Sequence, residues 1–131
     1  MKIALDLPGN RNIVRSYGPG EIRINEESYR ASLLLAPDRI EPDWMPAQFD
    51  DLQPEHFAAV IAMRPEVVLL GTGARLRFPA ARCLAPFAEA QIGVEVMDTG
   101  AACRTYNILM GEGRRVVAAL LMIEAQRPKA D

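Results

Sequence analysis

The second half of the chain alternates short apolar runs with amphipathic segments. The runs 66–70, 93–97 and 116–123 are rich in valine, leucine and isoleucine, which is typical of strands buried in a sheet. Between them, residues 80–90 and 99–110 place apolar side chains at helical spacing. Strand, helix, strand, helix, strand is the order of βαβ crossover units. The last run is the most apolar, so we expect it near the centre of the sheet.

The ends of the predicted helices carry recognisable signals. Pro54 and the acid after it are typical of a first helical turn, and Pro65 ends that first helix. Pro86 interrupts the second helix early. Asp98 is placed to cap the third helix, because its carboxylate can accept hydrogen bonds from N–H groups that lack a partner in the first turn. Gly111 is the expected stop of that helix.

The first half of the chain predicts shorter, antiparallel strands. Residues 13–17, 21–25 and 29–35 are apolar or alternate between apolar and polar positions. The turn at 18–20 consists of glycine, proline and glycine, and the polar turn at 25–28 separates the second and third segments. Together the three segments predict an antiparallel meander.

Residues 36–54 contain four prolines and no periodicity, which predicts a long irregular loop. Loops of this length inside compact domains tend to be functional or to be fixed by their own side chains. Trp44 and Phe49 are the candidate side chains. Either they anchor the loop to the body of the protein, or they contact a protein partner.

These elements predict a single α/β domain in which a central mixed sheet is flanked by helices and an N-terminal antiparallel meander adds further strands. A chain of 131 residues fits one domain and can bury roughly two thirds of its unfolded surface. Residues 1–12 are expected to form a loosely held arm, and residues 126–131 a frayed tail.

Composition narrows the classes of function. The formal net charge is −2, and thirteen arginines are scattered from Arg11 to Arg127 without a basic stripe, so nucleic acid is not an expected partner. The longest apolar run has eight residues, whereas a membrane span needs about 20. The start of the chain has no apolar signal region. We therefore expect a soluble, cytoplasmic protein that does not insert directly into a membrane.

Few residues are available for catalysis or metal binding. His56 is the only histidine, and no cluster of histidine, cysteine and acid has ligand spacing, so no metal and no cofactor are predicted. Cys83 and Cys103 lack CxxC spacing and are expected to be reduced and mostly buried. The sequence Asp98-Thr99-Gly100 matches the aspartic-protease tripeptide, but that site requires an all-β loop and here helical spacing follows. No catalytic residue is predicted, and whether the chain is an enzyme stays open.

A further candidate is the glycine loop after the strand 66–70. Its glycines permit a sharp turn and expose N–H groups, but it lacks the third glycine of a dinucleotide fingerprint and the lysine of a P-loop. If the strands ending at Leu70 and Met97 are parallel neighbours, this loop and the third helix share a crevice of the kind that binds ligands. A purely structural turn, with polar helix residues that pair nearby, is the alternative. The hypothetical binding residues for an anionic compound are Gly71, Thr72, Gly73, Arg75, Thr99, Arg104 and Asn107.

Four segments, 67–73, 93–99, 102–109 and 112–121, occur in an order and spacing that resemble a known family. It is a family of small domains of unknown function that includes the mitochondrial assembly factor for respiratory complex I. The resemblance covers residues 13–122 and implies a three-layer fold around a mixed sheet. It also implies a role in assembling or maintaining membrane complexes through protein contacts, and some bacterial relatives are similar to proteins encoded beside protein-export genes. It implies no catalytic residue. The lack of a targeting segment indicates a bacterial chain rather than a mitochondrial one.

Two functions follow as hypotheses. The first is a non-catalytic protein-interaction domain, an assembly or biogenesis factor for respiratory or export membrane complexes. The alternative is a small anionic-ligand-binding domain, or an enzyme, that uses the crevice at Gly71–Gly73 and the helix start at Thr99.

Overall fold

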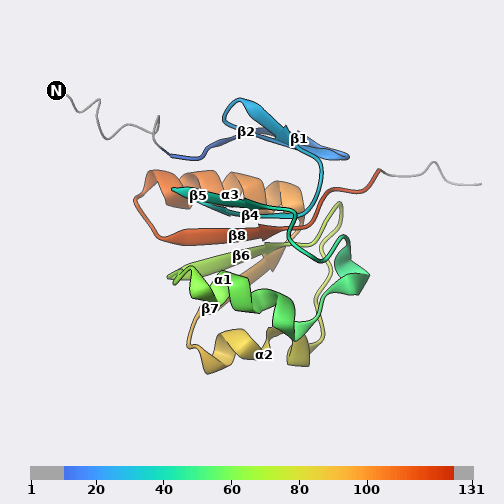
Figure 1. Cartoon of the computed structure of the whole chain (residues 1–131), viewed down its shortest axis with the longest axis vertical. Helices are drawn as coiled ribbons and strands as arrows, with labels where there is room; N and C mark the ends of the chain where they lie inside the picture. The colour runs from blue at the N-terminus through green and yellow to red at the C-terminus, as the bar shows by residue number, and fades with distance from the viewer. Residues whose placement is uncertain (1–10, 126–131) are drawn as a thin grey trace, which may run out of the picture.

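The computed structural model describes residues 11–125 and contains two sheets (Figure 1). A five-stranded sheet has the order β5-β4-β8-β6-β7, and a three-stranded sheet has the order β1-β2-β3. The strands are β1 Val14–Gly18, β2 Glu21–Ile24, β3 Glu27–Tyr29, β4 Leu33–Ala36, β5 Arg39–Pro42, β6 Val67–Gly71, β7 Gly93–Met97 and β8 Val116–Leu120. The helices are α1 Ala58–Ala62, α2 Ala81–Glu89 and α3 Thr99–Gly111, with short 3-10 turns η3 Phe49–Asp51 and η4 Pro54–Phe57.

The layers are arranged around the five-stranded sheet. Helices α1 and α2 cover one face, which we call the α2 side, and α3 together with the three-stranded sheet covers the other face, the α3 side (Figure 1). Strands β6, β7 and β8 are parallel to one another, and β4 joins β8 in antiparallel orientation. The predicted fold class, with its mixed sheet and added antiparallel strands, is confirmed.

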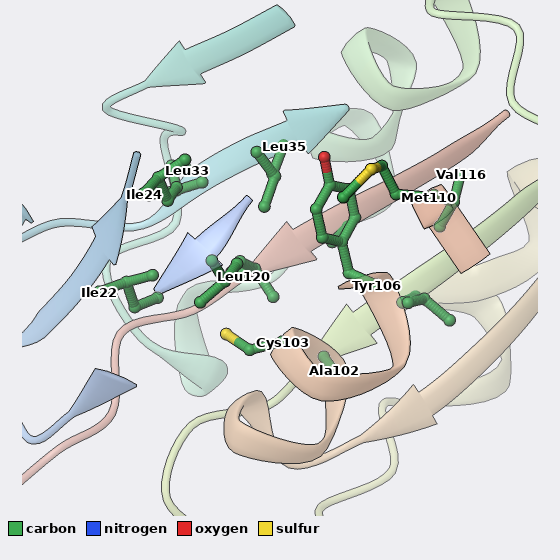
Figure 2. Close-up of a cluster of buried hydrophobic side chains, with 13 residues drawn as sticks. Ile22, Ile24, Leu33, Leu35, Ala102, Cys103, Tyr106, Met110, Val116 and Leu120 are labelled. Carbon is green, nitrogen blue, oxygen red and sulfur yellow. The ribbon is translucent and has the colours of Figure 1, made fainter. Parts of the chain in front are cut away.

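Each face of the central sheet has its own hydrophobic core. Leu69 on β6 points to the α3 side, whereas its neighbours Val68 and Leu70 point to the α2 side. Figure 2 shows the core on the α3 side, where Tyr106 and Met110 of α3 lie over the sheet. Because the central strands are buried on both faces, they read as continuous apolar runs in the sequence. The central position predicted for the last run is confirmed by β8.

The predicted third strand of the meander is wrong. Residues 29–35 are divided between β3, which ends at Tyr29, and β4, which begins at Leu33 and belongs to the five-stranded sheet. All four residues of β4 are buried, and a strand with two buried faces requires cover on both sides. A place between β8 and β5 in the larger sheet supplies that cover.

The irregular loop predicted for residues 36–54 contains regular structure. Residues Arg39–Pro42 form β5, which pairs with β4 in a hairpin, and the turn η3 follows. The Trp44 N–H then donates a 2.8 Å hydrogen bond to the Ser32 carbonyl. Prolines did not prevent a strand here because β5 is at the edge of the sheet, where one row of backbone groups needs no partner.

Helix boundaries follow the predicted signals, with two exceptions. Pro54 opens η4, which leads into α1. The interruption predicted at Pro86 is wrong, because α2 continues through Pro86 to Glu89. Helix α3 runs through Gly111, and the left-handed residue that ends it is Gly113, with φ of +81°. Among residues 11–125 there is no helix that is both long and apolar enough to cross a membrane.

Part of the predicted N-terminal arm is held firmly. The Asn12 N–H donates to the Pro37 carbonyl at 2.8 Å, and its side-chain amide donates to the Ala36 carbonyl at 2.9 Å. Arg11 reaches the Met110 carbonyl. These two residues are therefore tied to the sheet and to α3. The rest of the predicted arm, 1–10, and the predicted tail, 126–131, lie outside the described residues.

Candidate functional site

The candidate site lies at the carboxyl ends of the parallel strands. After β6 the chain leads to α2 on one side of the sheet, and after β7 it leads to α3 on the other side. Open α/β sheets bind ligands at such a divergence, because the two departing chains leave a crevice between them. Strands β6 and β7 are parallel neighbours, so the geometric condition for a shared crevice is met.

Thr99 closes the space between the glycine loop and α3. Its hydroxyl donates to the Leu121 carbonyl at 2.7 Å and accepts from the Gly73 N–H at 2.8 Å. The Thr99 N–H donates to the Gly73 carbonyl at 2.9 Å. Thr99 is fully buried. Gly73 and Thr99, two of the residues predicted to line a crevice, are thus brought together and bind each other.

Gly71 and Thr72 make this closure tight. A Cβ atom at Gly71 would lie 2.8 Å from the Thr99 hydroxyl oxygen and 2.9 Å from the Thr99 Cα, so a side chain does not fit. The Thr72 hydroxyl donates to the Arg75 carbonyl at 2.6 Å and accepts from the Arg77 N–H at 3.2 Å. The loop is therefore fixed by its own side chains. Arg75 itself is exposed.

The glycine loop already holds a carboxylate of this chain. The Ala74 N–H donates to Oε1 of Glu124 at 2.7 Å. The segment that carries Glu124 is held in place because the Gly20 N–H donates to the Ile123 carbonyl at 2.8 Å. An external anion at the Ala74 N–H would have to displace Glu124.

An open pocket of about 440 Å³ remains beside the closed crevice. The charged groups that line it are the carboxylates of Asp98 and Glu124 and the guanidinium of Arg104. Tyr17 and Gly100 also line the pocket. Two carboxylates against one guanidinium give this lining no positive excess for an anion.

Arg104 and Asn107 both face the three-stranded sheet. Arg104 lies near the ring of Tyr17, 5.9 Å from the ring centroid, and donates to the Tyr17 hydroxyl. Asn107 accepts from the Val14 N–H at 3.0 Å and donates to the Val14 carbonyl at 2.9 Å. Arg104 thus lines the pocket, whereas Asn107 is engaged by the backbone of β1.

Asp98 acts as the cap predicted for α3. Its Oδ1 accepts a 2.8 Å hydrogen bond from the Ala101 N–H, and the thirteen-residue helix follows directly. The aspartic-protease tripeptide therefore stands at a helix start and not in the all-β loop that such a site requires.

The cysteines and the histidine have structural surroundings. Burial raises the pKa of the Cys103 thiol to about 12, and burial also raises the pKa of the Cys83 thiol. A thiol with a raised pKa is a poor nucleophile at neutral pH, because the thiolate is the reactive form. His56 accepts a hydrogen bond from the Gln53 N–H through Nδ1 at 3.0 Å, as part of a capping box.

Trp44 and Phe49 were expected either to anchor the loop or to contact a protein partner. The Trp44 side chain is only 8% exposed, and its Nε1 donates to the His56 carbonyl at 3.1 Å, so its geometry favours the anchoring interpretation. Phe49 lies under the guanidinium of Arg77, 4.1 Å from the ring centroid. Arg77 also pairs with Asp50 at 3.0 Å.

Two exposed apolar side chains in the loop after β6 were missed in the sequence. Leu76 and Phe78 are 50% and 71% exposed, whereas Arg77 between them turns to the protein body. The alternation of arginine with apolar residues from Arg75 to Phe78 is the signal that marks this segment.

The chain matches the model of a family described as protein of unknown function (DUF498/DUF598) over residues 14–121. It is 36% identical to an uncharacterised protein of Rhodobacter capsulatus over 119 residues, which covers 89% of this chain and 90% of that protein. It is 28% identical over 110 residues to a "13 kDa major membrane protein" of Francisella tularensis, covering 82% of this chain and 88% of the relative.

Another relative carries a more specific name. The chain is 33% identical over 111 residues to NADH dehydrogenase [ubiquinone] 1 alpha subcomplex assembly factor 3 of Danio rerio, which covers 83% of this chain. The match spans 63% of that protein, which is less than two thirds of its length.

Solved structures have the same fold. A protein from Bordetella parapertussis superposes with a TM-score of 0.80 at 38% identity, covering 86% of this chain and 96% of that one. A Bordetella pertussis protein described as a Mth938-like domain superposes with a TM-score of 0.78 at 32% identity, covering 96% and 95%. The resemblance found in the sequence is confirmed, and the chain belongs to the DUF498/DUF598 family of proteins of unknown function.

Proposed function

We propose that the chain is a non-catalytic protein-interaction domain that assists the assembly or biogenesis of membrane complexes, respiratory or export, from a cytoplasmic location. The observation that carries the proposal is its relation, over most of its length, to a relative named as an assembly factor of NADH dehydrogenase. The relative is longer than the matched region, so the role is carried over as a proposal for this domain alone.

The side chains also support an interaction role. The side chains with the most reactive groups serve the fold itself. The Thr99 hydroxyl forms buried hydrogen bonds, the Asp98 carboxylate caps α3, and the Cys103 thiol is buried. Leu76 and Phe78 instead offer apolar area to a partner on a loop whose backbone is held in place.

The test is affinity capture of the tagged protein from its native host, with membranes solubilised and mild crosslinking. The wild-type protein should recover respiratory or export subunits. A double variant, Leu76→Ser with Phe78→Ser, should recover at least tenfold less of them. Ile108→Ser is the matched control, because Ile108 is 62% exposed on α3 and lies outside the loop. Capture of nothing above background by the wild-type protein would contradict the proposal.

The small-ligand alternative is supported by the 440 Å³ pocket beside Arg104. It receives less support than the interaction role, because the Ala74 N–H is already bound to Glu124 and two carboxylates line the opening. It stays a prediction for a ligand that replaces the Glu124 carboxylate.

A further inference from the structure

Four strands of the described chain lie at the edges of the two sheets, and they differ in how their outer backbone groups are protected. The strands are β1, β3, β5 and β7. An unpaired edge offers a row of N–H and C=O groups to any extended chain, and proteins block such edges with short strands, charges, prolines or covering groups.

Three of the four edges are protected. The N–H and carbonyl of Val14 on β1 are both bonded to the Asn107 side chain. Strand β5 carries the ion pair of Arg39 with Glu41 and ends in Pro42. Strand β3 has only three residues.

The edge of β7 has none of these features except one acid. Its five residues, Gly-Val-Glu-Val-Met, pair with β6 in unbroken parallel register. The Met97 carbonyl accepts from the Thr72 N–H on the β6 side. In a parallel ladder alternate residues bond to the same neighbour, so Val94 and Val96 direct their N–H and C=O groups away from β6. No hydrogen bond within residues 11–125 joins these groups to another segment.

The side chains of β7 favour one kind of occupant. Glu95 is exposed and pairs in register with Leu69, which places it on the α3 side, whereas Val94 and Val96 pack against the core of the α2 side. A second copy of the chain, paired antiparallel over all five residues, would set Glu95 directly opposite its own copy. Like charges directly opposite are destabilising, so self-pairing is disfavoured and a basic side chain is favoured.

We propose that the β7 edge receives an extended segment of a partner protein as a sixth strand, with a lysine or arginine opposite Glu95. The partner strand would bond to the free backbone groups of Val94 and Val96, in the manner of β-strand addition. This inference rests on the proposed interaction function and specifies the surface and chemistry of the partner.

The test is selection of displayed random twelve-residue peptides against the wild-type protein, Glu95→Lys and Val96→Pro. The wild-type protein should enrich β-branched, alternating peptides with a central lysine or arginine, and Glu95→Lys should enrich peptides with an acid at that position. Val96→Pro should bind the wild-type-selected peptides at least tenfold more weakly. This proline removes an outward N–H, so the fold should persist, and slow exchange of the Glu95 and Met97 amides checks it.

Hydrogen exchange locates the contact. In the free protein the amides of Val94 and Val96 should exchange rapidly, and a selected peptide should slow both at least tenfold. Three results would overturn the proposal: no enrichment of such peptides, equal enrichment by all three proteins, or slow exchange of both amides in the free protein. Protection that rises with protein concentration would indicate self-pairing and would also overturn it.

Native capture separates this inference from the function on which it rests. If Val96→Pro captures the same membrane-complex subunits as the wild-type protein, the β7 proposal fails and the interaction function stands. If the wild-type protein captures nothing, the proposed function fails, while the peptide selection still decides whether β7 accepts a strand.

Discussion

The single hydroxyl of Thr99 joins three segments that are far apart in the sequence. It connects the loop after β6, the start of α3 and the chain after β8. Thr99→Val would leave the Gly73 N–H and the Leu121 carbonyl buried without a partner, so we expect the free energy of unfolding to fall by about 2–4 kcal/mol. Thr99→Ser keeps the hydroxyl and should cost about 1 kcal/mol for the lost methyl group. Urea denaturation measures both, and equal losses would contradict the role of the hydroxyl.

Cys103 gives a prediction of pH dependence at the same scale. Burial raises its pKa from 9.0 to about 12, so above pH 9 the unfolded chain loses this proton while the folded protein keeps it. The free energy of unfolding should therefore fall between pH 9 and 12, with a slope of up to about 1.4 kcal/mol per pH unit from this thiol. Cys103→Ala should remove that share. Burial also raises the pKa of Tyr106, so some slope should remain. Identical slopes for wild type and variant would refute the assignment.

At the scale of secondary-structure elements, Asn107 is the connection between α3 and β1. Asn107→Ala removes two hydrogen bonds to Val14, and we expect a loss of about 2 kcal/mol in unfolding free energy together with faster amide exchange in β1 and β2. Ile108→Ala changes an exposed neighbour on the same helix and should cost less than about 0.5 kcal/mol. A similar exchange pattern in both variants would show that Asn107 does not hold the strand.

The elements differ in how far the sequence determines them. The local residue pattern was enough to predict strands β6, β7 and β8 and helix α3, because the signals of burial and of helix capping lie in neighbouring residues. The segment 29–35 was read as one strand because its division depends on the pairing of β4 with β8, more than 80 residues away in the chain. Strand β5 was missed because a charged edge strand has no apolar pattern and takes its order from β4. Local pattern thus specifies the elements that are buried, and pairing partners specify the others.

At the scale of the whole molecule, the glycine loop and the start of α3 were expected to meet if β6 and β7 were parallel neighbours; the strands are parallel neighbours, and the two segments meet. No pattern of neighbouring residues indicates that Thr99 fills the crevice or that Glu124 occupies the loop. Ala74 and Glu124 are 50 residues apart, and their contact exists only because β8 runs parallel to β6 and delivers the end of the chain to the same edge. An anion site was therefore predicted at a place where the chain supplies its own anion.

This internal carboxylate leads to a prediction for the complete fold. In the wild-type protein Glu124 is tethered beside the Ala74 N–H, and its high effective concentration should exclude inorganic phosphate at millimolar levels. Glu124→Ala frees that N–H, so phosphate should shift the amide signals of Gly73 and Ala74 at least tenfold more strongly than in the wild-type protein. Glu112→Ala is the matched control, because it removes the same charge at the far end of α3. If phosphate leaves the Glu124→Ala amides unchanged, the glycine loop has no affinity for anions of its own. Glu124 would then serve only to hold the segment after β8 against the glycine loop, and the ligand-binding alternative would lose its site.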